Sequence, residues 1–201
     1  MLAVAPLRGS GSEQVTRAMR ALDAVFLIGV EGVTEVWLVR HADCYEDIID
    51  TADPPLSALG RDQSARLAAR VQRAKPKAVY SSPYRRAIET AKAISDDVHV
   101  DDRLVEMALE VNEDGSLDLR EPPMDVTERM RAVVDEIAER HAGERIVVVS
   151  HGAAIIAYLT DVLHLEPGQL RMLPYYTSIS VVRALGDRRM VGALGDVAHL
   201  E

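Results

Sequence analysis

Several sequence features that indicate a particular class of protein are rare or absent in this chain. One cysteine in 201 residues excludes an internal disulfide framework and the usual cysteine-rich zinc site. Lysine and arginine total 23 against 32 aspartate and glutamate residues, and the net charge of -9 repels nucleic acid and anionic membrane surfaces. No apolar run is long enough for a membrane span or has the layout of a signal peptide. We therefore expect a cytoplasmic protein without nucleic-acid or membrane partners.

Sequence motifs that indicate a bound metal ion or a bound nucleotide are also absent. The histidines are widely spaced, and neither an H-x-x-x-H nor a C-x-x-C pattern occurs, so the sequence predicts no metal site. The G-x-x-x-x-G-K-[ST] loop is absent, which leaves nucleotide-dependent kinase chemistry unsupported. Any chemistry of this chain is expected to rely on its own side chains.

The sequence does contain enough apolar material for one well-buried domain, since 48% of its residues are hydrophobic. Residues 1–32 are expected to form a leader and a helical arm, because Val15, Met19 and Leu22 recur at spacings of three and four. The remainder, 33–201, is expected to be a single domain. The apolar face of the arm would either cover the domain or pair two subunits in a homodimer, and the sequence leaves both open.

Strands and helices are expected to alternate along this domain. Fully apolar runs predict buried strands at 35–40, 78–80 and 145–150, and each is followed by a segment with helical periodicity. Ser57 is expected to cap the first of these helices, and Pro83 to begin the second. Two runs that flank Gly186-Asp187 predict a hairpin. The pattern is typical of an α/β fold, a three-layer α/β/α sandwich with a mainly parallel sheet and an antiparallel edge.

Two of the strongest strands end directly on a histidine, "EVWLVRH" at His41 and "IVVVSHG" at His151. The third leads into "SSPYRR", which places Arg85 in the first turn of a helix, where backbone N–H groups favour an anion. Because ligands bind at the carboxyl ends of strands in open α/β sheets, these residues are expected to share a pocket.

At this point the sequence resembles the histidine phosphatase superfamily, also called the phosphoglycerate mutase-like family. The resemblance runs from about Val36 to Leu185. It rests on the segments "LVRHAD", "PLSALGRDQSARLA", "VYSSPYRRAIETA", "DDRLVEM" and "VVVSHGAAI". It implies that His41 is the nucleophile that becomes phosphohistidine and that Arg40 and Arg85 bind the phosphoryl oxygens. It also implies that His151 stabilises the transferring group and that Glu106 donates a proton.

The resemblance favours a metal-independent phosphohydrolase that acts on a small phosphorylated molecule or a phosphoprotein. The alternatives are a phosphoglycerate mutase-type phosphotransferase and a regulatory protein that binds a phosphorylated ligand with little or no turnover. A mutase needs an elaborated, closed pocket, whereas the segment that follows Glu106 is expected to be a short polar loop through Pro122-Pro123, so hydrolysis is preferred.

The loop after His41 departs from the family pattern. Asp47 stands where an asparagine is usual, and an ionised carboxylate there would repel phosphate, so we expect it to face solvent. Cys44 is interpreted as a small loop residue and not as a second nucleophile, because no separate base is evident. Substrate specificity is expected to involve Tyr45, Tyr84 and Tyr175.

Overall fold

A computed structural model describes residues 11–44 and 53–201, so the predictions for Asp47 and Tyr45 lie outside the described residues. The chain divides into two compact units, Met1–Glu31 and Gly32–Glu201. The first contains the helix α1 (Gly11–Val25), as the apolar spacing predicts. The assignment of residues 33–201 to a single phosphatase domain stays a prediction.

The second unit alternates strands and helices for most of its length. In chain order the elements are β1 (Thr34–Arg40), α2 (Ala58–Ala74), β2 (Ala78–Ser81), α3 (Arg85–Ile94), β3 (His99–Val100), the 3-10 helix η1 (Asp102–Leu104), β4 (Leu109–Val111), β5 (Leu117–Leu119), α4 (Pro123–Arg140), β6 (Arg145–Ser150), α5 (Gly152–Val162), β7 (Ile179–Leu185), β8 (Arg188–Asp196) and the 3-10 helix η2 (Ala198–Leu200).

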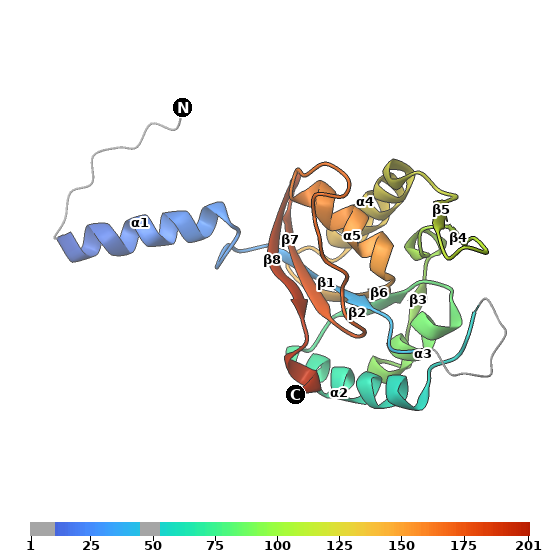
Figure 1. Ribbon diagram of the computed structural model, residues 1–201. Coiled ribbons are helices and arrows are strands. Elements are labelled where there is room, and N and C mark those ends of the chain that lie inside the picture. Colours follow the sequence, from blue (N-terminus) through green and yellow to red (C-terminus); the bar gives the residue numbers. More distant parts are fainter. Residues whose placement is uncertain (1–10, 45–52) are drawn as a thin grey trace. The chain divides into compact units, whose positions relative to one another are not determined.

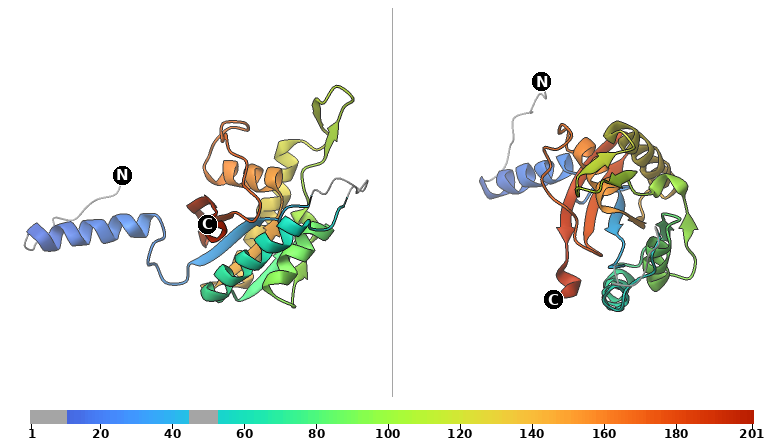
Figure 2. Two further views of the ribbon diagram at one scale, coloured as in Figure 1. Left: turned by 60° about the horizontal axis from the view of Figure 1, so that its bottom comes forward. Right: turned by 45° about the vertical axis from the view of Figure 1, so that its right-hand side comes forward.

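Six strands of the described chain form one sheet in the order β3-β2-β6-β1-β7-β8. The pairs β2/β3, β2/β6 and β1/β6 are parallel, whereas β7 runs antiparallel to β1 and to β8. The predicted fold is confirmed: helices cover both faces of a mainly parallel sheet, and the C-terminal hairpin supplies the antiparallel edge (Figures 1 and 2).

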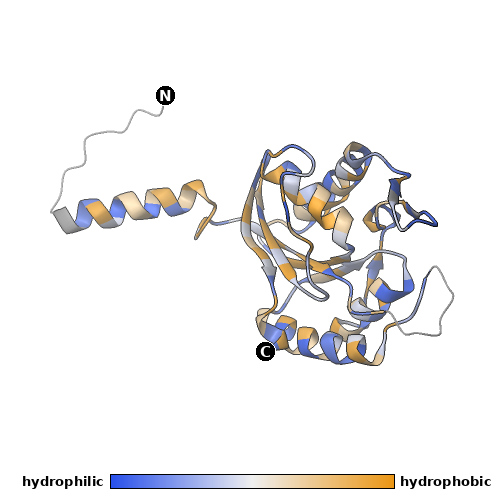
Figure 3. Ribbon diagram, in the orientation of Figure 1, coloured by the Kyte–Doolittle hydropathy of each residue, from blue (hydrophilic) through white to orange (hydrophobic). Residues whose placement is uncertain are grey.

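Strand β1 supplies both faces of the core by simple alternation. Val36 and Leu38 pack into the cluster that includes residues of α4 and α5, while Trp37 and Val39 belong to the cluster with residues of α2 and α3. The orange of apolar residues runs through the central strands in Figure 3. Each fully buried valine or leucine contributes roughly 1.5–3 kcal/mol relative to an exposed one, so these two clusters hold the layers together.

Two local expectations need correction. The stretch after Glu106, expected as a polar loop, contains the antiparallel hairpin β4/β5, with Leu109 paired to Leu119. The helix expected from Pro83 begins two residues later as α3, because Tyr84 has an extended backbone with ψ of 137° and serves as the N-cap. The first helical N–H, that of Arg85, donates to the Asp53 carboxylate at 2.9 Å. A carboxylate of the chain itself therefore lies at this helix N-terminus.

Helix α2 begins against the loop that follows β1. Ser57 caps it as predicted, since its Oγ accepts from the N–H of Gly60 at 2.9 Å and donates to the Asp43 carboxylate at 2.5 Å. A Cβ on Gly60 would lie only 1.9 Å from the carbonyl oxygen of Asp43. The approach of helix to loop requires glycine at this position.

Replacing Gly60 by alanine therefore tests how tightly α2 holds this loop. Alanine is the better helix former by about 1 kcal/mol, so propensity alone would stabilise the variant. We expect Gly60→Ala instead to lower the free energy of unfolding in urea by about 2 kcal/mol or more, because the backbone must shift.

Ser64→Ala on the same helix is the control. Its buried hydroxyl has no hydrogen-bond partner among residues 11–44 and 53–201, so its loss should cost under about 1 kcal/mol. A stabilised Gly60→Ala protein would contradict the clash.

Candidate active site

The register of β1 and β6 brings the two strand-end histidines together. Arg40 lies opposite Ser150 in the parallel ladder, so the next residue on each strand is His41 and His151. Their ring centroids are 5.0 Å apart, and both residues are buried. The structure thus brings the two histidines together at the carboxyl ends of these strands, as the sequence leads us to expect.

The hydrogen bonds of His41 define its tautomer. Its Nδ1 lies 2.8 Å from the carbonyl oxygen of Ala42, and because a carbonyl only accepts, Nδ1 carries the proton. The other nitrogen, Nε2, accepts from Nε of Arg86 at 3.3 Å. Burial lowers the pKa of His41 to about 3, and the charges of Arg86 and Arg40 act in the same direction. At neutral pH the ring is neutral and presents a lone pair on Nε2.

His151 is completely buried beside it. Its Nε2 lies 2.8 Å from the hydroxyl of Ser82, and its Nδ1 has no hydrogen-bond partner in the part of the chain that the structure describes. Burial lowers the pKa of His151, and the neighbouring His41 and Arg86 lower it further. A neutral ring with one uncommitted nitrogen is available to a ligand in the pocket.

Arg40 reaches the pocket from the end of β1. Its guanidinium donates to the carbonyl oxygen of Pro174 at 2.8 Å and stacks on Tyr176, with Cζ 4.0 Å from the ring centroid. Its Nε is buried without a partner among the described residues. A buried donor of this kind is satisfied when a ligand supplies the acceptor.

The second pocket arginine is Arg86, and the prediction of Arg85 is wrong in placement. Arg85 is 59% exposed and pairs with Glu89 one turn along α3, at 2.7 Å. Arg86 is only 12% exposed, contacts Nε2 of His41 and lies 3.4 Å from the carboxylate of Asp53. Of the two arginines, Arg86 is therefore the one that lies beside the histidines.

Helical spacing explains the difference between the two arginines. The buried residues of α3 are Ala87, Thr90 and Ala91, and Arg86 lies one turn before Thr90 on that face. Thr90 donates to the carbonyl oxygen of Arg86 at 2.7 Å and accepts from the N–H of Ala42 at 2.9 Å. The apolar periodicity of α3 was the signal that could have identified Arg86 from the sequence.

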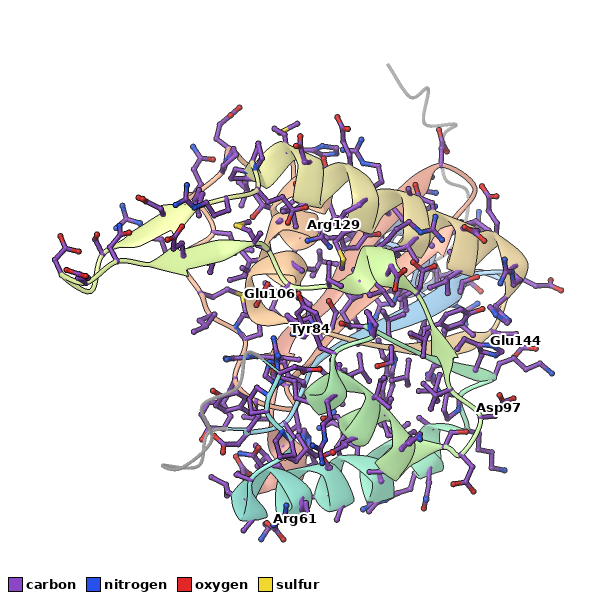
Figure 4. The ribbon with its side chains drawn as sticks, turned by 90° about the vertical axis from the view of Figure 1, so that its right-hand side faces the viewer. Arg61, Tyr84, Asp97, Glu106, Arg129 and Glu144 are labelled. Carbon is purple, nitrogen blue, oxygen red and sulfur yellow. The ribbon has the colours of Figure 1, made fainter. Side chains whose placement is uncertain are left out.

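The carboxylate of Glu106 lies at the N-terminus of α5, the helix that begins directly after His151. It accepts from the N–H groups of Met107 and Ala154 at 2.9 Å and of Ala153 at 3.3 Å. In the view of Figure 4 Glu106 lies between Arg129 and Tyr84. The guanidinium of Arg129 donates to the carbonyl oxygens of Arg103 and Val105 at 2.7 and 2.8 Å, which fixes the backbone that carries Glu106.

Aromatic rings line the pocket. The Tyr84 ring packs edge-on against His151, with centroids 5.1 Å apart, and the Arg86 guanidinium lies 4.7 Å from the Tyr84 centroid. Tyr176, which sequence reasoning missed, lies 5.8 Å from the ring of His41. Tyr175, which the sequence predicts to contribute to substrate specificity, is exposed.

Thr177 was also missed, and it holds the backbone of the strand end. Its N–H donates to the carbonyl oxygen of Arg40 at 3.0 Å, and its φ of 57° is rare for a β-branched residue. Its hydroxyl donates to the carbonyl of Tyr176 at 2.7 Å and is therefore the acceptor for Nε2–H of His199 at 3.0 Å. No sequence pattern signals this arrangement.

The surroundings of Cys44 disfavour its nucleophilic form. The residue is buried, and burial raises the pKa of its thiol, so the thiolate is disfavoured.

In the described ranges, 11–44 and 53–201, no group of three or more His, Cys, Asp or Glu residues is arranged to hold a metal ion. No described helix is long and apolar enough to cross a membrane.

Residues 36–120 and 109–197 match the sequence profile of the histidine phosphatase superfamily, branch 1. The chain belongs to this family. It is a phosphohydrolase of the histidine phosphatase type.

Curated relatives of the phosphatase include enzymes with two kinds of name. It is 30% identical over 198 residues to "phosphoserine phosphatase 1" of Hydrogenobacter thermophilus, covering 81% of this chain and 92% of that one. It is 29% identical over 204 residues to "probable phosphoglycerate mutase GpmB" of Yersinia enterocolitica, covering 83% and 95%. The solved structures that it resembles include a phosphoserine phosphatase of Entamoeba histolytica in complex with phosphoserine. That likeness has a TM-score of 0.72 at 20% identity and covers 84% of this chain and 100% of that one.

Arg86 and Arg85 provide a matched pair of variants. Arg86→Gln should lower kcat/KM for an aryl phosphate by about 10²–10³-fold, because a donor beside the reacting group is lost. Arg85→Gln removes the same charge one residue away and should change kcat/KM by less than about threefold. Steady-state kinetics on both proteins measure the difference. Equal losses in the two variants would show that long-range charge matters and the contact with His41 does not.

The buried histidines make stability depend on pH. The folded pKa of His41 is about 3, against an ordinary value of 6.5, so between these values the unfolded chain binds a proton that the folded chain does not. The free energy of unfolding should therefore fall as pH drops below about 6.5, by about 1.4 kcal/mol per pH unit for each such histidine. Urea unfolding at about pH 7.5 and about pH 5.5 measures this slope. His41→Gln should have the shallower slope, and an unchanged slope would contradict the low pKa.

Proposed function

We propose that the phosphatase hydrolyses small phosphomonoesters through a phosphohistidine on His41, without a metal ion. The observation that supports the proposal most directly is the protonation state and orientation of the His41 ring. Its Nδ1–H is committed to the carbonyl of Ala42, its low pKa keeps Nε2 unprotonated, and Arg86 lies at Nε2. A neutral imidazole of fixed orientation is a competent nucleophile towards phosphorus.

In the first step Nε2 of His41 attacks phosphorus and the bond from phosphorus to the ester oxygen breaks. Arg40, Arg86 and His151 are proposed to donate to the phosphoryl oxygens, where negative charge is concentrated. Guanidinium groups suit this task because their paired N–H donors match two oxygens at once. The uncommitted Nε of Arg40 and Nδ1 of His151 support these roles.

Glu106 is proposed to protonate the leaving alkoxide. In the second step the same carboxylate accepts a proton from water as the water oxygen attacks phosphohistidine, which releases inorganic phosphate and restores His41. The three backbone donors around the carboxylate support this proposal, because they hold Glu106 in one orientation at the N-terminus of α5, the helix that begins directly after His151.

A small phosphorylated molecule is the proposed substrate. The structural relatives are described as complexes with phosphoserine and with 3-phosphoglyceric acid, which supports this class over a phosphoprotein. Hydrolysis is preferred to mutase chemistry because only the short hairpin β4/β5 separates Glu106 from α4. Location in the cytoplasm and pairing into a homodimer stay predictions.

The decisive experiment traps the intermediate. Wild-type protein quenched during turnover of a ³²P-labelled phosphomonoester should carry label that is labile in acid and stable in alkali, as expected for a phosphorus–nitrogen bond. His41→Ala should carry none and should lose turnover, because the attacking atom is gone. Label that survives acid, or that maps to Cys44, would exclude the phosphohistidine route.

Two controls accompany it. Turnover should be unchanged by EDTA, because arginines supply the charge that a metal would otherwise supply. Circular dichroism should confirm that His41→Ala is folded. Recovery of activity only on addition of a divalent ion would count against the proposal.

A further inference from the structure

The side chain of Arg129, on α4, uses every one of its hydrogen-bond donors within the protein. A guanidinium has five N–H groups. In Arg129, Nε and one terminal nitrogen donate to the two carboxylate oxygens of Glu121 at 2.7 and 2.9 Å. The other donors reach the carbonyl oxygens of Arg103, Val105 and Glu106 at 2.7, 2.8 and 3.3 Å. No N–H of Arg129 is therefore left for a substrate oxygen, and its task is to hold the chain around Glu106.

Glu121 holds the same segment from its other side. Its carboxylate also accepts from the N–H of Ala108 at 3.2 Å, and its own N–H donates to the carbonyl oxygen of Ala108 at 3.3 Å. The hydrogen bonds from Arg129 lower the pKa of Glu121, so the pair is ionised at neutral pH. A bidentate pair of this kind fixes orientation as well as distance. Both flanks of Glu106 are thus tied to α4 through one ion pair.

This attachment matters because proton transfer is sensitive to distance. Three backbone N–H groups orient the carboxylate of Glu106, but it meets them only where its own backbone is correctly placed. Figure 4 shows Arg129 and Tyr84 on opposite sides of Glu106. A misplacement of about 1 Å caused by a distant mutation can cost about 100-fold in rate. The ion pair therefore decides whether the acid reaches the leaving oxygen.

We infer that the ion pair of Arg129 and Glu121 positions Glu106 for proton transfer and so determines how well the phosphatase cleaves esters with poor leaving groups. The inference rests on the role proposed above for Glu106. A phenolate must receive a proton from Glu106 as its bond to phosphorus breaks, whereas 2,4-dinitrophenolate leaves as a stable anion. Loss of the pair should therefore slow the first kind of ester and spare the second.

Arg129→Met tests this with phenyl phosphate and 2,4-dinitrophenyl phosphate. We expect kcat/KM to fall by about 10–100-fold for the phenyl ester and by less than about threefold for the dinitrophenyl ester. The quantity measured is kcat/KM because it reports only the steps up to cleavage of the ester bond, so the later use of Glu106 with water does not enter. A variant that is merely less stable would lose both activities alike.

Arg131→Met is the matched control. It removes the same group two residues further along α4, where Arg131 is 48% exposed and pairs with Asp161. Its kcat/KM should stay within about threefold of wild type for both esters, because an exposed ion pair contributes little. A selective loss in this control would show that any charge removed from α4 has the effect.

Glu106→Gln supplies the reference, because it removes the proton itself. It should show the same selective loss for phenyl phosphate, by about 100-fold or more. Glu121→Gln keeps the size of the side chain and removes its charge, so it should show the same pattern in a weaker form. Since both residues act through one pair, Arg129→Met/Glu121→Gln should lose no more than Arg129→Met alone.

The outcomes separate this inference from the proposed function. If Glu106→Gln is selective and Arg129→Met slows both esters equally or neither, Glu106 keeps its role and the inference fails. If Glu106→Gln slows both esters equally, Glu106 is not the proton donor and the inference falls with that role. If circular dichroism shows that Arg129→Met is unfolded, Glu121→Gln decides between the same outcomes, because it leaves the carbonyl contacts of Arg129 in place.

Discussion

The parallel pairing of β1 with β6 is the constraint on which the site depends. The ladder aligns Arg40 with Ser150, and the N–H of His41 donates to the carbonyl of Ser150 at 2.9 Å, so the two histidines leave the sheet side by side. A slip of one residue would turn every side chain of β1 to the opposite face. The apolar clusters on the two faces prevent that slip, because Leu38 and Val39 pack into different ones. The packing of the core therefore determines how His41 and His151 lie relative to each other.

The same burial sets the charge state of the site. Two buried imidazoles lie beside two arginines, and burial lowers the pKa of each ring. The positive charge at the site is therefore carried by the guanidinium groups and not by the histidines. This division is useful for phosphoryl transfer, because a protonated imidazole has no lone pair with which to attack. An incoming phosphate dianion is attracted by the arginines while the nucleophile stays neutral.

Apolar periodicity and the residues at strand ends were enough to predict most of the sheet and part of the site. Apolar runs located the buried strands and the C-terminal hairpin, and parallel connectivity brought His41 together with His151. The choice between Arg85 and Arg86 required the phase of a helix whose start was expected two residues too early. Thr177 could not be found, because its left-handed backbone depends on contacts with a strand end more than a hundred residues away.

That separation along the chain has a consequence for biosynthesis. His41 leaves the ribosome long before β6 and the segment of Thr177 are translated. The residues that surround His41 are therefore not in place until those late segments pair with β1. Contacts between residues so distant in sequence form slowly, since a long loop must close first. Catalytic competence therefore cannot precede assembly of the whole sheet. For this chain, an assay of turnover also measures the completion of folding.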